Sequence, residues 1–453
     1  MILKGGKIAL PGREKFFEGD IRIEGGKIAE IGENLDGGEK VDCSGLMIFP
    51  GGIDAHTHFD DPGYTHREDF LSASSAAAAG GITTIIDMPC TSVPPVTNLE
   101  NLRTKLEVVR RKSVVDFGFY GGVSAQSFEE NFPQNVRELA PYVFGFKTYF
   151  ISGMRTFARL DHWQFRQVLR ETIKLGVPVL VHAEDFDYVN SATQFQKSRG
   201  DSPREYYLSR PEVAELLAVG AVADILRDVL TETGLPSGFK PVHIVHISYY
   251  RSVDKLMGLP ITCETCPHYL EFNLDDFVRI GSPLKVTPPV KSGDNPQKLW
   301  RYLAVGKIDF VASDHAPAPY EEKYTGSVWT DYSGIPGVGT LFPYLLSEGF
   351  FRGRISLRRF VEIASAAPAK RYKIPSKGAI APGYDADLVL VDPSLTWKVE
   401  GKKFFSRGKI TPFEGYEFRG RIVRTFVRGK VVYDFQRGIV APPGYGEFLT
   451  PCR

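Results

Sequence analysis

The chain has 453 residues, enough for a large hydrophobic core and for two domains. Its 55 Lys and Arg against 54 Asp and Glu give a formal net charge of +1, which argues against nucleic acid or a membrane surface as partner. No apolar run approaches the length of a membrane span, and the first residues turn polar without the apolar stretch of a signal peptide. The 5 cysteines are scattered, which fits a reducing compartment, so we expect a cytoplasmic protein.

Both ends of the chain have the pattern of short antiparallel strands. Apolar and polar residues alternate between Gly-Gly turns at residues 1–10, 20–32 and 38–50, and a similar pattern returns at 386–401 and 420–435. We expect these segments to pair with each other in a discontinuous β-sandwich-like domain. That domain would be formed by residues 1–50 together with residues 376–453.

Between these ends, apolar strands alternate with helical stretches. The strand candidates are Met47–His56, Thr83–Met88, Asp116–Val123, Gly145–Phe150, Pro178–Glu184, His243–Ser248, Ile261–His268 and Asp309–His315. Helical segments are expected at 98–112, 163–175, 210–233 and 295–305. Eight strand–helix units predict an α/β fold with a (β/α)8 TIM barrel at residues 51–375. In such barrels the chemistry gathers at the carboxyl ends of the strands.

Two histidines, His56 and His58, end the first predicted barrel strand. Side chains alternate along a strand, so this pair points to one side and provides half of a divalent-metal site. Isolated pairs of this kind also occur on solvated strands. The interpretation therefore depends on which residues end the other strands.

Residues that can bind metals also end strands four, five, six and eight. They are Lys147, His182, His246 and Asp314. Taken singly, each has an ordinary alternative: a core lysine paired to a carboxylate, satisfied core histidines, or a helix-capping aspartate. Together these alternatives require several coincidences at one rim, so we predict a metal site. A buried lysine beside cations is disfavoured, but reaction with carbon dioxide would convert its amine into an anionic, bridging carbamate.

Other histidines and cysteines have subordinate predicted roles. On a regular strand His243 would face the surrounding helices, so we interpret it as structural. His268 and His315 are candidates for supporting the ligands or contacting a substrate. Cys263 and Cys266 lack a second cysteine pair, which favours buried thiols over a zinc or redox centre.

Segments along nearly the whole chain resemble the cyclic amidohydrolases of the amidohydrolase superfamily, which comprise allantoinases, dihydroorotases and hydantoinases. They include DAHTHFDDPG, AAAAGGITTIIDMP, GFKTYF, PVLVHAED, HIVHIS, ETCPHYL, KVTPPV, ASDHAPAP and KGAIAPGYDADLVLVDP. The resemblance implies two divalent metal ions, with zinc as the expected metal, bridged by carboxylated Lys147. It also implies a small cyclic ureide as substrate and a homo-oligomer, either a dimer or a tetramer.

The resemblance further implies a role for each ligand. His56, His58 and Asp314 would hold the more buried metal, and His182 and His246 would hold the other. Asp314 would also be the catalytic residue, taking a proton from the attacking water species and passing it to the departing amide nitrogen. The product would be a ring-opened ureido acid.

The expected substrate ring follows from the positions at which this chain differs from the residues usual in each member of the group. Dihydroorotases usually have an arginine at the position of Asp60, and asparagines at the positions of Cys90 and Thr287. An aspartate at that place would repel a substrate carboxylate. Hydantoinases have a substrate-binding tyrosine where this chain has Ser152. Allantoinases match more segments, although Asp60 also departs from the small polar residue expected in them.

We therefore expect allantoin to be opened to allantoate, with dihydroorotase and hydantoinase or dihydropyrimidinase activity as alternatives. The substrate-binding candidates are Asp60, Cys90, Ser152, Thr287, Ser333 and Gly334. An alternative of another class is a non-catalytic relative that uses the barrel for assembly. Such relatives typically lose metal ligands, and all six ligand positions are present in this chain.

Overall fold

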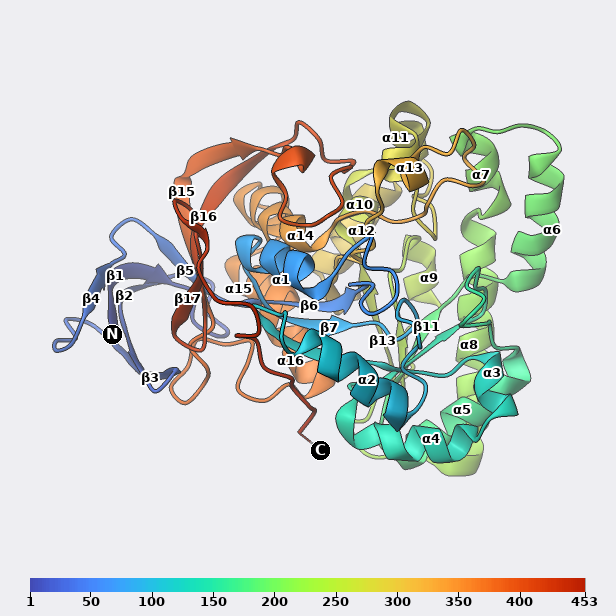
Figure 1. Ribbon diagram of the computed structural model, residues 1–453, viewed down its shortest axis with the longest axis horizontal. Coiled ribbons are helices and arrows are strands. Elements are labelled where there is room, and N and C mark those ends of the chain that lie inside the picture. The colour runs from blue at the N-terminus through green and yellow to red at the C-terminus, as the bar shows by residue number, and fades with distance from the viewer. Residues whose placement is uncertain (453) are drawn as a thin grey trace.

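The computed structural model describes residues 1–452, in which a β-sheet unit lies beside a larger, helix-covered barrel (Figure 1). The strands of the sheet come from both ends of the chain. They are β1 (Ile2–Ile8), β2 (Phe17–Glu24), β3 (Lys27–Gly32), β4 (Lys40–Asp42), β5 (Met47–Pro50), β15 (Leu388–Lys398), β16 (Glu417–Val427), β17 (Lys430–Asp434) and β18 (Gly438–Ile439). Their order is β18-β17-β16-β15-β5-β1-β2-β3, with β4 beside β1.

The two ends of the chain meet where β5 pairs with β15. The strands are antiparallel, with Phe49 opposite Val389. Residues from both ends also form a small hydrophobic cluster, in which Leu3, Leu388 and Phe426 are fully buried. The expected pairing of the terminal segments is thus confirmed. The domain boundaries at residues 50 and 376 stay a prediction.

Parallel strands form the barrel. They are β6 (Gly52–Thr57), β7 (Ile82–Asp87), β8 (Asp116–Phe119), β9 (Gly121–Gly122), β10 (Phe146–Tyr149), β11 (Val179–His182), β12 (Val242–Ile244), β13 (Ile261–Thr265) and β14 (Phe310–Val311). β9 continues β8 beyond Tyr120, so the wall has the eight predicted positions. A parallel bridge between Thr57 and His315 closes the ring. Every residue of these strands is buried, as expected where side chains fill the barrel and helices cover its outside.

The first predicted strand, Met47–His56, is wrong as a single strand. Met47–Pro50 belongs to the sheet unit, and the barrel strand begins at Gly52. The chain crosses between the two at Gly51, where a Cβ atom would lie 2.1 Å from the hydroxyl of Thr83. Both units bury their strands, so the apolar run continues through the crossing without a break in the sequence pattern.

Helices surround the barrel (Figure 1). They are α1 (Phe70–Ala79), α2 (Leu99–Val109), α3 (Ala125–Glu129), α4 (Phe132–Leu139), α5 (His162–Lys174), α6 (Phe186–Lys197), α7 (Pro203–Ser209), α8 (Glu212–Thr233), α9 (Tyr250–Asp254), α10 (Pro267–Glu271), α11 (Leu274–Ile280), α12 (Asn295–Ala304), α13 (Tyr320–Lys323), α14 (Val338–Tyr344), α15 (Leu357–Val361) and α16 (Ala367–Tyr372). Several begin at side-chain caps that their sequences provide. For example, Asp161 accepts the backbone N–H of Gln164 at 2.7 Å at the start of α5.

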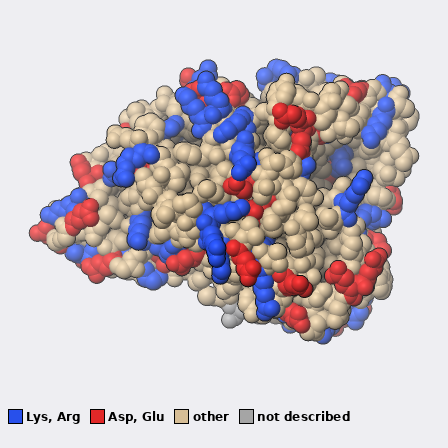
Figure 2. Space-filling view, viewed as in Figure 1, with Lys and Arg blue, Asp and Glu red and all other residues tan. Residues whose placement is uncertain are grey.

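The outer surface is mixed in charge. On the face drawn in Figure 2, Lys and Arg are interspersed with Asp and Glu, in keeping with the net charge of +1. Across residues 1–452, no helix has both the length and the apolar character that a bilayer crossing demands.

A buried ion pair fixes the backbone that follows the two histidines of β6. Lys105 Nζ lies 2.5 Å from Asp87 Oδ2, and both side chains are at most 1% exposed. The other carboxylate oxygen of Asp87 accepts the backbone N–H of Phe59 at 2.8 Å. The pair therefore joins α2 and β7 to the segment that carries His58.

We expect Lys105→Met to lower the free energy of unfolding by about 3–5 kcal/mol, because it leaves the buried Asp87 carboxylate without a compensating charge. Urea unfolding followed by circular dichroism measures this loss. The control is Lys174→Met, since Lys174 is 57% exposed and its pair with Glu171 should contribute at most about 1 kcal/mol. Equal losses for the two variants would contradict the role of the buried pair.

Candidate metal centre

The six predicted ligand residues meet at the carboxyl ends of the barrel strands. His56 is on β6 and Lys147 on β10, while His182 is the last residue of β11. His246 and Asp314 follow the ends of β12 and β14. All but Asp314 are buried, and its side chain is 15% exposed. Parallel strands deliver these side chains to one rim although they span more than half of the sequence.

The donor atoms lie close together. Asp314 Oδ1 is 3.1 Å from His56 Nε2 and 3.4 Å from His58 Nε2. On the other side, His182 Nδ1 lies 3.0 Å from His246 Nε2. One potential ligand atom from each of His56, His246 and Asp314 falls within 4.8 Å of the others. A group of imidazoles and a carboxylate at these separations suits a divalent cation.

Several of these atoms have no hydrogen-bond partner. His246 Nδ1 and Lys147 Nζ are shielded from solvent and unpaired, and His56 Nε2 is shielded and makes no hydrogen bond, with Asp314 Oδ1 beside it at 3.1 Å. Buried polar atoms are normally hydrogen-bonded, so a convergent set of unpaired ones indicates that they serve a ligand. The residues present therefore fit a metal centre.

The protonation of His56, His246, Asp314 and Lys147 agrees with metal binding, whereas for His58 burial is outweighed by the effects of Cys90 and Asp314, which raise its pKa to about 10. Burial lowers the pKa of His56 and His246 well below the usual value, which leaves neutral imidazoles with free lone pairs. Burial alone would raise the pKa of Asp314, but the surrounding histidines hold it well below its usual range. Burial lowers the pKa of Lys147 to about 8, which makes the neutral amine that carbamate formation requires more accessible than in an ordinary lysine.

The backbone at the rim is strained. Seven non-glycine residues among those described have positive φ, and three of them are Asp60, His246 and Asp314, at 59°, 40° and 50°. Left-handed backbone costs about 1–2 kcal/mol for most side chains. Such strain persists where surrounding contacts impose it, and it clusters at functional sites.

The sequence pattern of the amidohydrolase family matches residues 47–432, which span the barrel and most of the C-terminal sheet. The chain belongs to the amidohydrolase family. It is 37% identical to an allantoinase of Rubrobacter xylanophilus, covering 100% of this chain and 98% of that protein. An allantoinase of Solibacter usitatus is 36% identical, with 99% and 96% covered. The solved structure of an L-hydantoinase (dihydropyrimidinase) from Arthrobacter aurescens has a TM-score of 0.91, 31% identity and 99% coverage of both chains.

These comparisons confirm the predicted resemblance and the TIM-barrel fold. Both allantoinases and the hydantoinase align over nearly their full lengths, so the likeness covers the sheet unit as well as the barrel. The individual ligand and substrate-binding assignments stay predictions. The contacts of each candidate residue in this amidohydrolase are described next.

Two buried carboxylates that the sequence analysis missed orient the candidate ligands. Glu264 Oε1 lies 2.5 Å from His56 Nδ1, and Glu184 Oε2 lies 2.8 Å from His182 Nε2. Arg210 pairs with Glu184 at 2.6 Å. A carboxylate on the second nitrogen of a metal-binding histidine fixes its tautomer and ring orientation. Glu264 is a charged residue within an apolar strand, as Lys147 is, and that signal was available in the sequence.

The expectation that His243 faces the helices is wrong. Its Nε2 lies 3.1 Å from Glu264 Oε2 and its Nδ1 lies 2.7 Å from Thr262 Oγ1, among side chains of the barrel interior. If one regular strand contained both His243 and His246, their side chains would point to opposite sides. β12 ends at Ile244, so this alternation does not apply. With a φ of 40°, His246 is no longer part of the regular strand. The interpretation of His243 as structural fits these contacts.

Two of the predicted substrate-binding residues, Thr287 and Ser333, come together around Tyr206, which the sequence analysis missed. The Tyr206 hydroxyl lies 2.7 Å from Thr287 Oγ1 and 3.2 Å from Ser333 Oγ. Gly334 has a φ of 148°, and a Cβ atom there would lie 2.2 Å from the carbonyl oxygen of Ala316. Only glycine allows the chain to pass so close to the segment that follows Asp314.

Cys90 and Asp60 lie beside His58. Cys90 Sγ is 3.8 Å from His58 Nδ1 and 3.0 Å from the hydroxyl of Tyr149. The Tyr149 ring has Lys147 Nζ over its face at 4.7 Å. Tyr149 is another residue that the sequence analysis missed, although it follows Lys147 at the spacing that shares a strand face. Asp60 is fully buried with both carboxylate oxygens unpaired, and burial raises its pKa to about 8.

Ser152 is placed differently from the other candidates. Its hydroxyl donates to the carbonyl of Phe157 at 2.7 Å and accepts the N–H of Met154 at 3.1 Å. These bonds stabilise the loop after β10. Among the contacts of the described residues, none joins Ser152 to the metal-binding group, so its substrate role stays a prediction.

The two remaining histidine candidates differ. His315 is engaged away from the centre: its Nε2 lies 3.2 Å from Glu68 Oε2, and its Nδ1 accepts the N–H of Val338 at 3.3 Å. Both nitrogens of His268 are buried without a hydrogen-bond partner. His268 is thus the better candidate for contact with a bound molecule.

We expect Glu264→Gln to weaken metal binding by about 10–100-fold, because an amide holds the imidazole of His56 less firmly than a carboxylate does. Competition with a chromogenic chelator measures the affinity, and circular dichroism checks the fold. The control is Glu348→Gln, which changes a buried carboxylate bound to the surface residue Arg352 at 2.7 Å. Unchanged affinity in folded Glu264→Gln protein would rule out the orienting role.

Proposed function

We propose that this amidohydrolase opens a cyclic ureide ring and that it converts allantoin to allantoate. The observation that supports hydrolysis best is the convergence of six ligand-type side chains on one rim, where buried nitrogens of His56, Lys147 and His246 make no hydrogen bond. The full-length similarity to curated allantoinases supports the choice of ring. The similarity to a hydantoinase structure makes hydantoin or dihydropyrimidine opening the second candidate.

We further propose a centre for two divalent cations, with zinc as the expected metal. His56, His58 and Asp314 would hold one cation, and His182 and His246 the other. Carboxylated Lys147 would bridge them. When bound, such cations lower the pKa of a shared water and polarise the carbonyl that is attacked.

Asp314 is proposed as the residue that moves the proton. It is an ionised carboxylate at the rim with its side chain partly open to solvent, so it can reach both protein ligands and an incoming ring. It would accept the proton of the attacking water and return it to the ring nitrogen as the carbon–nitrogen bond breaks. The His56 and His58 rings beside it would keep its carboxylate in place.

The hydroxyls of Tyr206, Thr287 and Ser333 are proposed to hold the ring amide. Hydroxyl groups both donate and accept hydrogen bonds, and a ureide ring presents alternating N–H and C=O groups. The Tyr206 hydroxyl already lies 2.7 Å from that of Thr287 and 3.2 Å from that of Ser333. A neutral polar ring can therefore be bound without a charged partner.

The arrangement around Asp60 favours a neutral substrate over an anionic one. A guanidinium at this place would bind a substrate carboxylate, but Asp60 has a carboxyl group there instead. Arg67 is the arginine that acts on Asp60, but its Nε already binds Glu322 Oε2 at 2.7 Å. Its guanidinium also lies over the ring of Tyr332 at 4.6 Å. The expected homo-oligomeric state and cytoplasmic location stay predictions.

The purified, metal-loaded protein should open allantoin faster than dihydroorotate, hydantoin or dihydrouracil. We expect a preference over dihydroorotate of about 100-fold or more in kcat/KM, because no free guanidinium is offered to its carboxylate. Ring opening followed by absorbance or by ureido-acid detection measures the panel. Faster opening of dihydroorotate would overturn the allantoin assignment, and no activity on any member would favour the non-catalytic alternative.

Lys147→Ala should reduce the metal content below that of the parent protein and slow ring opening by about 100-fold or more, since it removes the bridging ligand. Elemental analysis and the ring-opening assay measure the two effects. Adding a short carboxylic acid should restore part of both by replacing the carbamate. The control is Lys174→Ala, at a 57% exposed position. It should keep the metal content and activity of the parent protein, with or without the added acid. Full metal content and activity in Lys147→Ala would contradict the bridge.

A further inference from the structure

A cavity lies at the opposite end of the barrel from the metal-binding group. Its volume is about 1070 Å³, and it is lined by residues at the amino ends of the strands, including Pro178 before β11 and Lys240 before β12. His182 and His246, on the same two chain segments, lie at the carboxyl ends. At about 3.3 Å per strand residue, the two places are on the order of 15 Å apart. The cavity is therefore separate from the proposed catalytic site.

The lining of this cavity is rich in basic side chains. Six lysines and arginines line it against three acidic residues, on a chain whose net charge is only +1. Two of the basic groups are engaged. Arg359 donates to two backbone carbonyls and pairs with Glu362 at 2.9 Å, and Lys240 lies 3.9 Å from Asp309.

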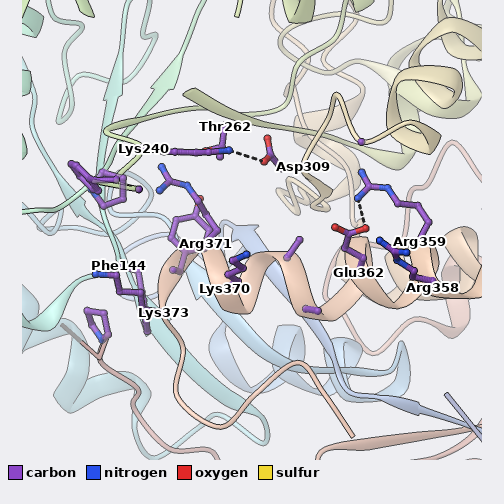
Figure 3. A pocket seen from close by; sticks show the side chains of 18 of the residues that line it. Phe144, Lys240, Thr262, Asp309, Arg358, Arg359, Glu362, Lys370, Arg371 and Lys373 are labelled. Atoms are coloured by element: carbon purple, nitrogen blue, oxygen red, sulfur yellow. Dashed lines mark ion pairs between the residues drawn. The ribbon is translucent and has the colours of Figure 1, made fainter. Parts of the chain in front are cut away.

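The other four basic groups lack acidic partners. Within the part of the chain that the structure describes, Arg358, Lys370, Arg371 and Lys373 have no carboxylate within 4 Å. Figure 3 shows Lys370, Arg371 and Lys373 on and just after α16, with Arg371 extending toward the strand ends that carry Lys240. Arg358, on α15, lies at the other side of the same cavity.

Arg371 gives the second, independent indication of a ligand. Its Nε is shielded from solvent and has no hydrogen-bond partner, and its one backbone contact, to the carbonyl of Val242, is long at 3.4 Å. Arg371 is only partly exposed, and a shielded N–H group such as its Nε is normally hydrogen-bonded. An oxyanion held between Arg371 and the neighbouring lysines would supply the missing acceptor.

We propose that this cavity binds a small organic phosphate, with the phosphate held by Arg371, Lys370 and Lys373. Phosphate oxygens match the planar donors of arginine and accept the charge-assisted bonds of lysine. The volume is larger than inorganic phosphate needs and slightly exceeds the usual range of small-molecule sites. Phe144 and Pro178 provide an apolar wall for the organic part of the molecule.

Isothermal titration of the metal-loaded, full-length protein tests the proposal, with ribose 5-phosphate and inorganic phosphate as probes. We expect saturable binding of ribose 5-phosphate below about 10 mM, weaker binding of inorganic phosphate, and none of ribose or of potassium chloride at matched ionic strength. The double variant Lys370→Glu/Lys373→Glu changes two exposed side chains of the proposed site and should weaken binding roughly tenfold or more. Arg103→Glu, an exposed charge reversal on α2, is the matched control and should bind as the parent does.

A measurement on the unaltered protein makes the test independent of variant folding. Ribose 5-phosphate should slow the acetylation of Lys370 and Lys373, as mapped by mass spectrometry, and leave Lys402 unaffected at its 79% exposed position. Absence of saturable binding, equal binding by the double variant and the control, or uniform acetylation would each overturn the proposal. A chain that binds the phosphate but opens no ureide would refute only the proposed function.

Discussion

The candidate metal centre depends on the closure of the barrel. Thr57 pairs with His315 across the seam, the N–H of His58 binds the carbonyl of His315 at 2.8 Å, and Asp54 accepts the N–H of Ser313 at 3.0 Å. These bonds join segments that are more than 250 residues apart in the sequence. They place the histidines of β6 beside Asp314, so the site exists only when the whole ring is formed. Local folding of either segment could not hold the imidazoles and the carboxylate together.

Behind this seam, buried carboxylates position the groups that would touch a metal. Glu264 holds His56, Glu184 holds His182, and Asp87 fixes the backbone after His58. Burying a charge is costly, but Glu184 and Asp87 each have at least two polar partners that offset the loss of water, and burial raises the pKa of Glu264 well above its usual value. Buried carboxylates thus hold the candidate ligand residues in place, while the atoms that would bind a metal lack hydrogen-bond partners. That is the arrangement expected of a site that is formed before its ligand binds.

Strand-end residues could be predicted from the sequence because barrel topology brings every strand end to the same rim. All six candidate ligands followed from that rule together with the resemblance. What escaped prediction depended on contacts between strands: the pairing of Glu264 with His56, the Tyr206 hydroxyl beside Thr287, and the inward orientation of His243. Strand periodicity does not show where a strand ends, and this caused the errors at His243 and at the crossing at Gly51.

The two ends of the barrel have opposite electrostatic character, which the net charge of +1 conceals. At the carboxyl ends, neutral imidazoles and the Asp314 carboxylate present lone pairs, so this rim suits cations. At the amino ends, Lys370, Arg371 and Lys373 gather without carboxylates, so this rim suits anions. The outer surface is mixed in charge, but at these two rims charges of opposite preference are separated. The net charge of a protein therefore indicates its long-range attraction to a polyanion. The few charges that face one cavity decide which ligand that cavity prefers.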